Sequence, residues 1–271
     1  MMATRARVLS VAGSDSGGGA GIQADLKTFS ALGAYGMTAI TAITVQNTQG
    51  VSGVQTADPA VVAAQIAAVA SDIGVDAAKT GMLMNAAIVH AVADGLREAG
   101  VDKVVVDPVS VSKHGYLLLE PAALDALRSE LLPLALLVTP NLLEAEALTG
   151  LEVRTRDAMR RAAEAIRGEG ALAVLVKGGH LGDAAAADLL MDADGEEWLE
   201  VERIETPNTH GTGCTLSAAI AVHLAMGEDL RSAVRAGKAF VTGAIAHALA
   251  LGRGVGPVDQ LWMGPAPADP G

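Results

Sequence analysis

The chain has 271 residues, of which 51% are hydrophobic and only 2% aromatic, and its formal net charge is −12. Its 31 acidic residues outnumber 19 basic ones, which argues against nucleic acid as a partner, because such surfaces are built from clustered lysine and arginine. A single cysteine excludes an intrachain disulfide and a cysteine-based zinc site and is typical of a reducing compartment, so we expect a cytoplasmic protein. No apolar run approaches the ~18 uninterrupted residues of a membrane span, so we expect no membrane partner.

The first half of the chain alternates between strand-like and helix-like patterns. Asp58, followed by Pro59, and Asn85 are typical N-caps of helices. Each apolar strand pattern ends in polar or glycine residues before the next helix begins. The expected elements are strands at 8–12, 37–45, 75–79 and 103–106 and helices at 22–32, 58–71 and 85–99.

The second half continues this alternation and adds one antiparallel feature. Two short runs flank Asp194-Gly195, and this spacing predicts a β-hairpin. The stretch 254–271 is rich in proline and glycine and is expected to be a loop or tail. The remaining expected elements are strands at 135–138, 172–176, 187–191 and 197–201, a helix opened by Pro121, helices at 142–148, 155–167 and 216–226, and one further apolar helix.

Strands that alternate with helices about every 30 residues predict parallel βαβ units with right-handed crossovers. No linker or change of composition divides the chain, so we expect one doubly wound α/β domain over residues 1–271. In such a sheet the ligand lies beyond the carboxyl ends of the strands. Polar clusters that follow strand ends should therefore share one edge, and these clusters lie at 13–21, 46–48, 79–82, 107–109, 141–144 and 177–180.

The stretch at 208–215, Asn-Thr-His-Gly-Thr-Gly-Cys-Thr, joins a glycine-rich turn to an apolar helix. The first N–H groups of a helix have no internal partner and lie at the positive end of its dipole, so this turn predicts an anion-binding site. Cys214 stands at that helix start, where a thiolate is favoured, which makes it a candidate base or nucleophile. The alternative is a small, buried, apolar cysteine.

The glycine-rich loop at 13–21 has neither the dinucleotide-binding nor the P-loop spacing, so a Rossmann cofactor is not expected. Its glycines allow either close approach of a small ligand or only a tight turn. Asp25, one turn into the following helix, bonds a ligand amine or faces solvent.

Asn141 and Glu144 lie three residues apart at a helix start, where they form a capping box or hold a hydrated Mg²⁺ through water. Lys177, followed by two glycines at a strand end, suits a nucleotide phosphate. Lys79 has a structural alternative, and Lys238 is either solvated or reaches a phosphate.

Taken in order, these motifs are more specific than any one of them. They resemble the hydroxymethylpyrimidine/phosphomethylpyrimidine kinases of thiamin biosynthesis over nearly the whole chain. The resemblance implies the ribokinase-like fold, a mostly parallel sheet flanked by helices with a small β element near the substrate. It also implies ATP-dependent phosphorylation of 4-amino-5-hydroxymethyl-2-methylpyrimidine and then of its monophosphate. The motifs that carry it are at 11–28, 46–48, 79–83, 107–109, 139–145, 177–180 and 208–214.

The resemblance also implies roles for single residues. Cys214 matches the position of an aspartate base in many ribokinase-like enzymes, and Gly211, Thr212 and Gly213 match the anion hole. The amide of Gln46 would bond the aminopyrimidine edge. The other implied roles are framing of the ring by Gly13, Asp25, Met82 and Val109, binding of magnesium and phosphate by Asn141 and Glu144, and contact with ATP by Lys177 and Lys238.

The chain departs from the family pattern after residues 107–109. Ser110 and His114-Gly115 stand where the family usually carries a methionine and a Ser-Gly pair, so we assign no role to this loop. Pyridoxine/pyridoxal kinases of the same fold share much of the pattern and remain an alternative, as does an inactive protein that keeps the pocket. Self-association as a homodimer is expected from the superfamily.

Overall fold

The computed structural model describes residues 5–110, 119–179, 181 and 185–264. Within these residues, one nine-stranded sheet has the order β3-β2-β1-β4-β5-β6-β7-β8-β9. The pairs from β2 through β1 to β7 are parallel, and β3, β8 and β9 are added in antiparallel fashion. The strands are β1 (Arg7–Asp15), β2 (Tyr35–Asn47), β3 (Gly50–Thr56), β4 (Ala77–Thr80), β5 (Val104–Val106), β6 (Leu137–Val138), β7 (Val174–Val176), β8 (Ala185–Asp192) and β9 (Gly195–Glu202).

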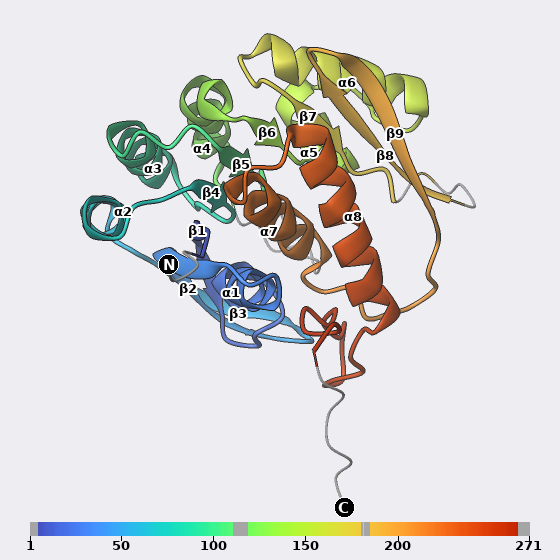
Figure 1. Ribbon diagram of the computed structural model, residues 1–271, viewed down its shortest axis with the longest axis horizontal. Helices are drawn as coiled ribbons and strands as arrows, with labels where there is room; N and C mark the ends of the chain where they lie inside the picture. The colour runs from blue at the N-terminus through green and yellow to red at the C-terminus, as the bar shows by residue number, and fades with distance from the viewer. Residues whose placement is uncertain (1–4, 111–118, 180, 182–184, 265–271) are drawn as a thin grey trace, which may run out of the picture.

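Helices cover both faces of the sheet, which confirms the doubly wound α/β architecture (Figure 1). On β5, Val104 and Val106 point into one helical layer and Val105 into the other, so the strand is apolar throughout. One layer contains α1 (Gly21–Ala31), α7 (Thr212–Ala225) and α8 (Leu230–Ala246). The other contains α2 (Pro59–Asp72), α3 (Ala86–Glu98), α4 (Pro121–Ala126), α5 (Leu142–Thr149) and α6 (Arg156–Gly168), with short turns at Leu127–Leu131 and Leu132–Leu134.

The predicted helix starts are confirmed where a side chain caps them. Asp58, Asn85 and Thr155 each accept a hydrogen bond from a backbone N–H of the first turn, which satisfies a group that has no partner within the helix. The predicted hairpin is confirmed as β8 and β9. One strand was not expected: β3 pairs with β2 after a tight turn at Thr48 and Gln49, and its two glycines obscured the alternation of side chains.

The order of the strands reverses at β1, which places the functional edge of the sheet. The chain passes from β1 outward to β2 and β3, then returns to β4 on the other side of β1. Ligands of such sheets bind beyond the carboxyl ends of the strands at this reversal. The β2–β3 pair borders the same edge, as expected of a small β element near the substrate, because Thr44 and Gln46 of β2 line the pocket there.

Residues 247–264 contain no helix or strand, and residues 265–271 lie outside the described part. The loop is nevertheless packed against the domain, since Val258 and Gln260 are buried. In the described ranges, no helix is both long enough and apolar enough to cross a lipid bilayer.

Candidate active site

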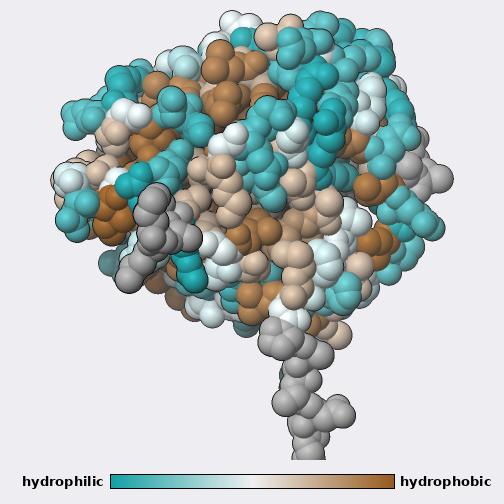
Figure 2. Space-filling model, viewed as in Figure 1, coloured by the Kyte–Doolittle hydropathy of each residue, from teal (hydrophilic) through white to brown (hydrophobic). Residues whose placement is uncertain are grey.

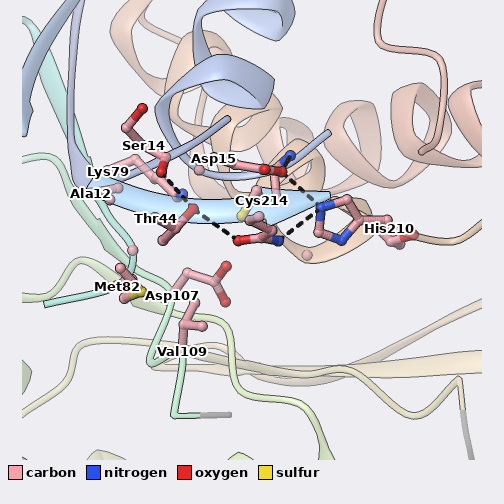
Figure 3. Close-up of a pocket in the computed structure, with 18 of the residues that line it drawn as sticks. Ala12, Ser14, Asp15, Thr44, Lys79, Met82, Asp107, Val109, His210 and Cys214 are labelled. Carbon is pink, nitrogen blue, oxygen red and sulfur yellow. Dashed lines mark hydrogen bonds and ion pairs between the residues drawn. The ribbon is translucent and has the colours of Figure 1, made fainter. Parts of the chain in front are cut away.

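A pocket opens where the carboxyl ends of the central strands meet the starts of α5 and α7 (Figure 3). The prediction that polar strand-end clusters share one edge is confirmed. Of the predicted site residues, the pocket brings together Gly13, Gln46, Met82, Val109, Asn141, Glu144, Lys177, Gly211, Thr212, Gly213 and Cys214. Asp25 and Lys238 do not line it.

A second pocket adjoins the first on the side of β8 and α8. Its lining includes Asp188 of β8 and Lys238, Val241 and Ile245 of α8. The two pockets have four lining residues in common, Asn141, Lys177, Thr212 and Gly213. Two ligands bound in these pockets would therefore meet at the start of α7.

The start of α7 depends on glycine. Gly211 adopts a left-handed conformation with φ of 84°, and a Cβ added there would lie 1.9 Å from the Gly19 carbonyl oxygen. A Cβ on Gly213 would lie 3.3 Å from Lys177 Nζ. The turn therefore exposes backbone rather than side chains, and the helix N-terminus is suited to an anion beside Lys177.

Lys177 joins two buried carboxylates at the boundary between the pockets. Its Nζ donates to Asp107 Oδ1 at 2.9 Å and lies 3.8 Å from Glu144 Oε2. Asp107 also accepts hydrogen bonds from Thr139 and Ser217. Burial raises the pKa of Glu144 to about 7 against the opposing charge of Lys177, with Asp107 adding to the rise. The positive charge of Lys177 is therefore nearly balanced by the negative charge of the two carboxylates.

Asn141 and Glu144 form the predicted capping box. Asn141 Oδ1 accepts from the Glu144 N–H at 2.9 Å, and Glu144 Oε2 accepts from the Asn141 N–H at 2.7 Å. The two alternatives are compatible, because both residues also line the pocket. No group of three or more His, Cys, Asp or Glu side chains in the described ranges could hold a metal ion. The carboxylates of Asp107 and Glu144 line the pocket, and oxygen donors of this type fit a hydrated Mg²⁺.

The surroundings of Cys214 differ from the thiolate site expected at a helix start. Burial raises its pKa from an ordinary 9.0 to about 11, and the carboxylates of Asp25 and Asp107 add to this effect. Lys79 and the Gly21 amide oppose it without reversing it. Cys214 is therefore a protonated thiol at neutral pH, and the expected lowering of its pKa is wrong.

Asp25 is fully buried beneath the pocket, so neither expected role, ligand contact or solvent exposure, matches its position. Both of its carboxylate oxygens lie 3.0 Å from Lys79 Nζ, and Ser10 Oγ donates to it at 2.5 Å. Lys79 is itself fully buried, which confirms its structural alternative. Burial raises the pKa of Asp25, although Lys79 opposes the rise. This buried ion pair ties α1 to β4.

Lys238 lies in the second pocket and is held by Asp188. Its Nζ donates to Asp188 Oδ2 at 2.6 Å, while Asp188 Oδ1 accepts from the Gly178 N–H at 3.0 Å. Asp188 thereby connects α8 to the glycine pair after Lys177. The sequence offered no sign of this carboxylate, because its partners are 10 and 50 residues away.

The glycine-rich loop at 13–21 wraps around a side chain of its own. The carboxylate of Asp15 accepts from the N–H groups of Gly17, Gly19 and Ala20 at 2.8–3.1 Å. These donors are thus used internally and do not face a ligand. The tight-turn alternative is confirmed for this part of the loop, while Gly13 still lines the pocket.

Asp15 also bonds His210 at 2.8 Å (Figure 3). Neither residue was predicted to belong to the site. Burial raises the pKa of Asp15, but His210 and the loop amides outweigh this effect and leave it below its ordinary value. An aspartate followed by Ser-Gly-Gly-Gly is typical of a turn in which the side chain accepts backbone N–H groups. That signal could have identified Asp15, whereas nothing local indicated His210.

Ser110 is partly buried at the end of the described segment. His114, Gly115 and His180 lie outside the described residues.

Comparisons with known proteins agree with this geometry. The family described as phosphomethylpyrimidine kinase matches residues 15–259. A hydroxymethylpyrimidine/phosphomethylpyrimidine kinase of Rhizobium meliloti is 57% identical over 93% of this chain and 96% of its own. One of Streptomyces coelicolor is 53% identical over 94% of each chain. The ADP complex of a Bacillus subtilis pyridoxal kinase superposes with a TM-score of 0.90 at 43% identity and covers 96% of this chain and 99% of its own.

These matches confirm the resemblance and the ribokinase-like fold that it implied. They extend over nearly all of the described residues, including every strand-end motif that lines the two pockets. The chain is therefore a kinase and belongs to the phosphomethylpyrimidine kinase family.

Proposed function

We propose that this protein transfers the γ-phosphoryl group of ATP to 4-amino-5-hydroxymethyl-2-methylpyrimidine and then to its monophosphate, for thiamin biosynthesis in the cytoplasm. The observation that carries the proposal is the pair of pockets that share the start of α7. The pyrimidine occupies the pocket with Gln46, and ATP occupies the one with Lys238. The proposal includes a homodimer, as the superfamily leads us to expect.

The anion hole supplies most of the catalysis. The Thr212 N–H is bonded to the Thr209 carbonyl oxygen. The next N–H of the first turn of α7, at Gly213, meets the charge on the transferring phosphoryl group, and Lys177 adds a positive charge beside it. Because the donors are held before the reaction begins, little reorganisation is needed in the transition state. Glu144 would hold Mg²⁺ through water, and the ion would supply further neutralisation of the phosphate charge.

Cys214 orients the acceptor hydroxyl group. With a pKa of about 11, it accepts the hydroxyl proton only in its minor thiolate form. A loose phosphoryl-transfer transition state requires little deprotonation at an early stage, so a weakly populated base suffices. Gln46, Gly13, Met82 and Val109 frame the ring, while Asp25 supports the pocket from below through Lys79.

The alternative with specific support is a pyridoxal kinase, because the Bacillus subtilis enzyme superposes so well. The higher identity to the pyrimidine kinases favours the first proposal. An amide at Gln46 also suits an aminopyrimidine edge, since it donates and accepts at once.

A coupled assay of ADP formation distinguishes the pyrimidine kinase from the pyridoxal kinase. It uses three acceptors: the hydroxymethylpyrimidine, its monophosphate and pyridoxal. We expect kcat/KM for both pyrimidines to exceed that for pyridoxal by at least tenfold. A preference for pyridoxal would establish the alternative. No turnover with any of the three acceptors would indicate an inactive, pocket-retaining protein.

A further inference from the structure

A line of hydrogen bonds runs along one wall of the substrate pocket from Asp15 to Ser14 (Figure 3). Asp15 contacts His210, the His210 ring contacts the amide of Gln46, and that amide contacts Thr44. The line ends where Thr44 Oγ1 lies 2.9 Å from the Ser14 carbonyl oxygen. Gln46 is therefore held at both ends of its amide group.

At the Asp15 end of this line, His210 is a rigidly held hydrogen-bond donor. A carboxylate that already accepts three backbone N–H groups can only accept, so His210 Nε2 carries a proton and donates it at 2.8 Å. The ring has little room to move, since a Cβ added to Gly19 would lie 2.5 Å from His210 Cδ2. Its backbone is bonded on both sides to the C-terminal loop, at Gly256 and Val258.

At the other end of the line, the Thr44 hydroxyl acts as a hydrogen-bond acceptor towards Gln46. The Ser14 carbonyl only accepts, so the Thr44 hydroxyl donates its proton there and has only lone pairs left for Gln46. The structure places the amide oxygen of Gln46 3.2 Å from Thr44 Oγ1 and the amide nitrogen 3.3 Å from His210 Nε2. The oxygen and the nitrogen of an amide exchange places by a half-turn of the group. After this half-turn the NH₂ donates to Thr44, and the carbonyl oxygen accepts a share of the His210 Nε2 proton. Each donor on the wall meets an acceptor only in this orientation of the amide.

We propose that Asp15 and His210 are positioning residues that fix the polarity of the Gln46 amide, so that the pocket selects heterocycles by the order of donor and acceptor along one edge. The inference rests on the proposed function, and it assigns specificity to residues that need not touch the substrate. The aminopyrimidine edge presents a ring-nitrogen acceptor beside an amino donor. Its 4-oxo analogue presents a ring N–H donor beside a carbonyl acceptor, which is the reversed order.

A fixed amide distinguishes these two edges, whereas a freely rotating amide adapts to both. The test compares kcat/KM for the aminopyrimidine and for its 4-oxo analogue in four proteins. We expect the wild type to prefer the amino compound by roughly tenfold or more, the factor that one mismatched hydrogen bond produces. His210→Leu removes the donor and should reduce this preference towards one, with the KM for ATP unchanged.

His210→Gln supplies an N–H at a similar reach and should restore the preference to within a few-fold of wild type. His223→Leu is the matched control, because His223 forms the same type of pair with Glu228 at 2.7 Å on the far end of α7. It should leave the preference unchanged.

A preference that stays constant in His210→Leu, even with lower activity towards both compounds, would show that His210 is only structural and would overturn the inference. If His210→Leu does not fold by circular dichroism, Thr44→Val tests the other end of the amide by the same ratio. A wild-type protein that phosphorylates neither compound would refute the proposed function itself. A wild type active on both compounds without preference would refute only the inference.

Discussion

Cys214 is surrounded by charges of both signs at the bottom of the substrate pocket. Lys79 stabilises its thiolate, while Asp25 and Asp107 oppose it. The net effect of burial and these charges is a pKa of about 11. At the residue scale, therefore, the motif places the thiol at the helix start, and the neighbouring side chains decide its protonation.

This protonation can be measured through alkylation of the single cysteine. Because only the thiolate reacts, the rate with iodoacetamide in the folded protein should still rise about tenfold per pH unit between pH 8 and 10. The denatured chain is the control, and its rate should level off near the ordinary thiol pKa of 9.0. A plateau at or below pH 9 in the folded protein would contradict the raised pKa.

If Cys214 accepts the substrate proton, its removal should be seen in turnover. Cys214→Ala should lower kcat by roughly 10²–10⁴-fold, the usual contribution of a general base, with little change in the KM for ATP. Steady-state kinetics with the hydroxymethylpyrimidine provide the measurement. A variant with near wild-type kcat would eliminate the base role.

At the scale of elements, α7 and the β8–β9 hairpin border the second pocket, which is the proposed nucleotide site. The hairpin is held by exposed ion pairs from α6 and α8, and hydrophilic residues gather over this region of the surface (Figure 2). Such exposed pairs each contribute little to stability. The exception is the mostly buried pair of Lys238 and Asp188, which we expect to order the second pocket.

The two ends of α7 allow a matched pair of glycine substitutions, Gly211 before its start and Gly227 after its end. Gly227 has a positive φ of 91° but open space around its Cβ position, whereas Gly211 combines φ of 84° with a contact at 1.9 Å. Gly227→Ala should therefore cost only the left-handed strain of about 1–2 kcal/mol and leave kcat unchanged. Gly211→Ala should cost more and reduce kcat strongly, because the Gly19 loop must move.

Urea unfolding and steady-state kinetics on both variants give the comparison. Equal losses of stability and unchanged activity would show that the packing of Gly211 against Gly19 is unimportant.

At the scale of the whole molecule, the C-terminal loop closes the chain over its N-terminal loop. Gln260 is buried, and its side-chain NH₂ donates to the Gly19 carbonyl oxygen at 3.3 Å and to Thr215 Oγ1 at 3.2 Å. Val255 and Val258 add backbone bonds to Thr48 and His210. Segments more than 200 residues apart in the chain thus pack together beside His210, which lines the first pocket.

Gln260→Ala should destabilise the protein by about 1–3 kcal/mol, the usual cost of leaving buried polar groups without a partner. It should also raise the KM for the pyrimidine, because the loop that holds His210 loosens. Asp259→Ala, in the same loop, is the control, since its carboxylate bonds the exposed Leu261 N–H. Chemical denaturation and substrate titration distinguish the two variants, and equal effects of both would contradict this role of Gln260.

The local sequence pattern was sufficient to predict those features that depend on residues close together in the chain. The capped helices and the strand-end clusters depend on hydrogen bonds and periodicities within a few residues, so they were predicted with small errors at their ends. Of the thirteen site residues predicted from the ordered motifs, eleven line one pocket in the structure. The strand β3 was missed because its partner β2, rather than its own glycine-containing pattern, stabilises it.

Only the tertiary structure determined which charged and polar side chains pair with one another. Asp25 pairs with a lysine 54 residues away, and Asp15 with a histidine 195 residues away. Burial in those contacts turned a predicted ligand residue into a support beneath the pocket and a predicted thiolate into a thiol. The sequence by itself determined the family and the edge of the sheet that binds ligands, whereas protonation and the direction of hydrogen bonds depend on desolvation by residues far apart in the chain.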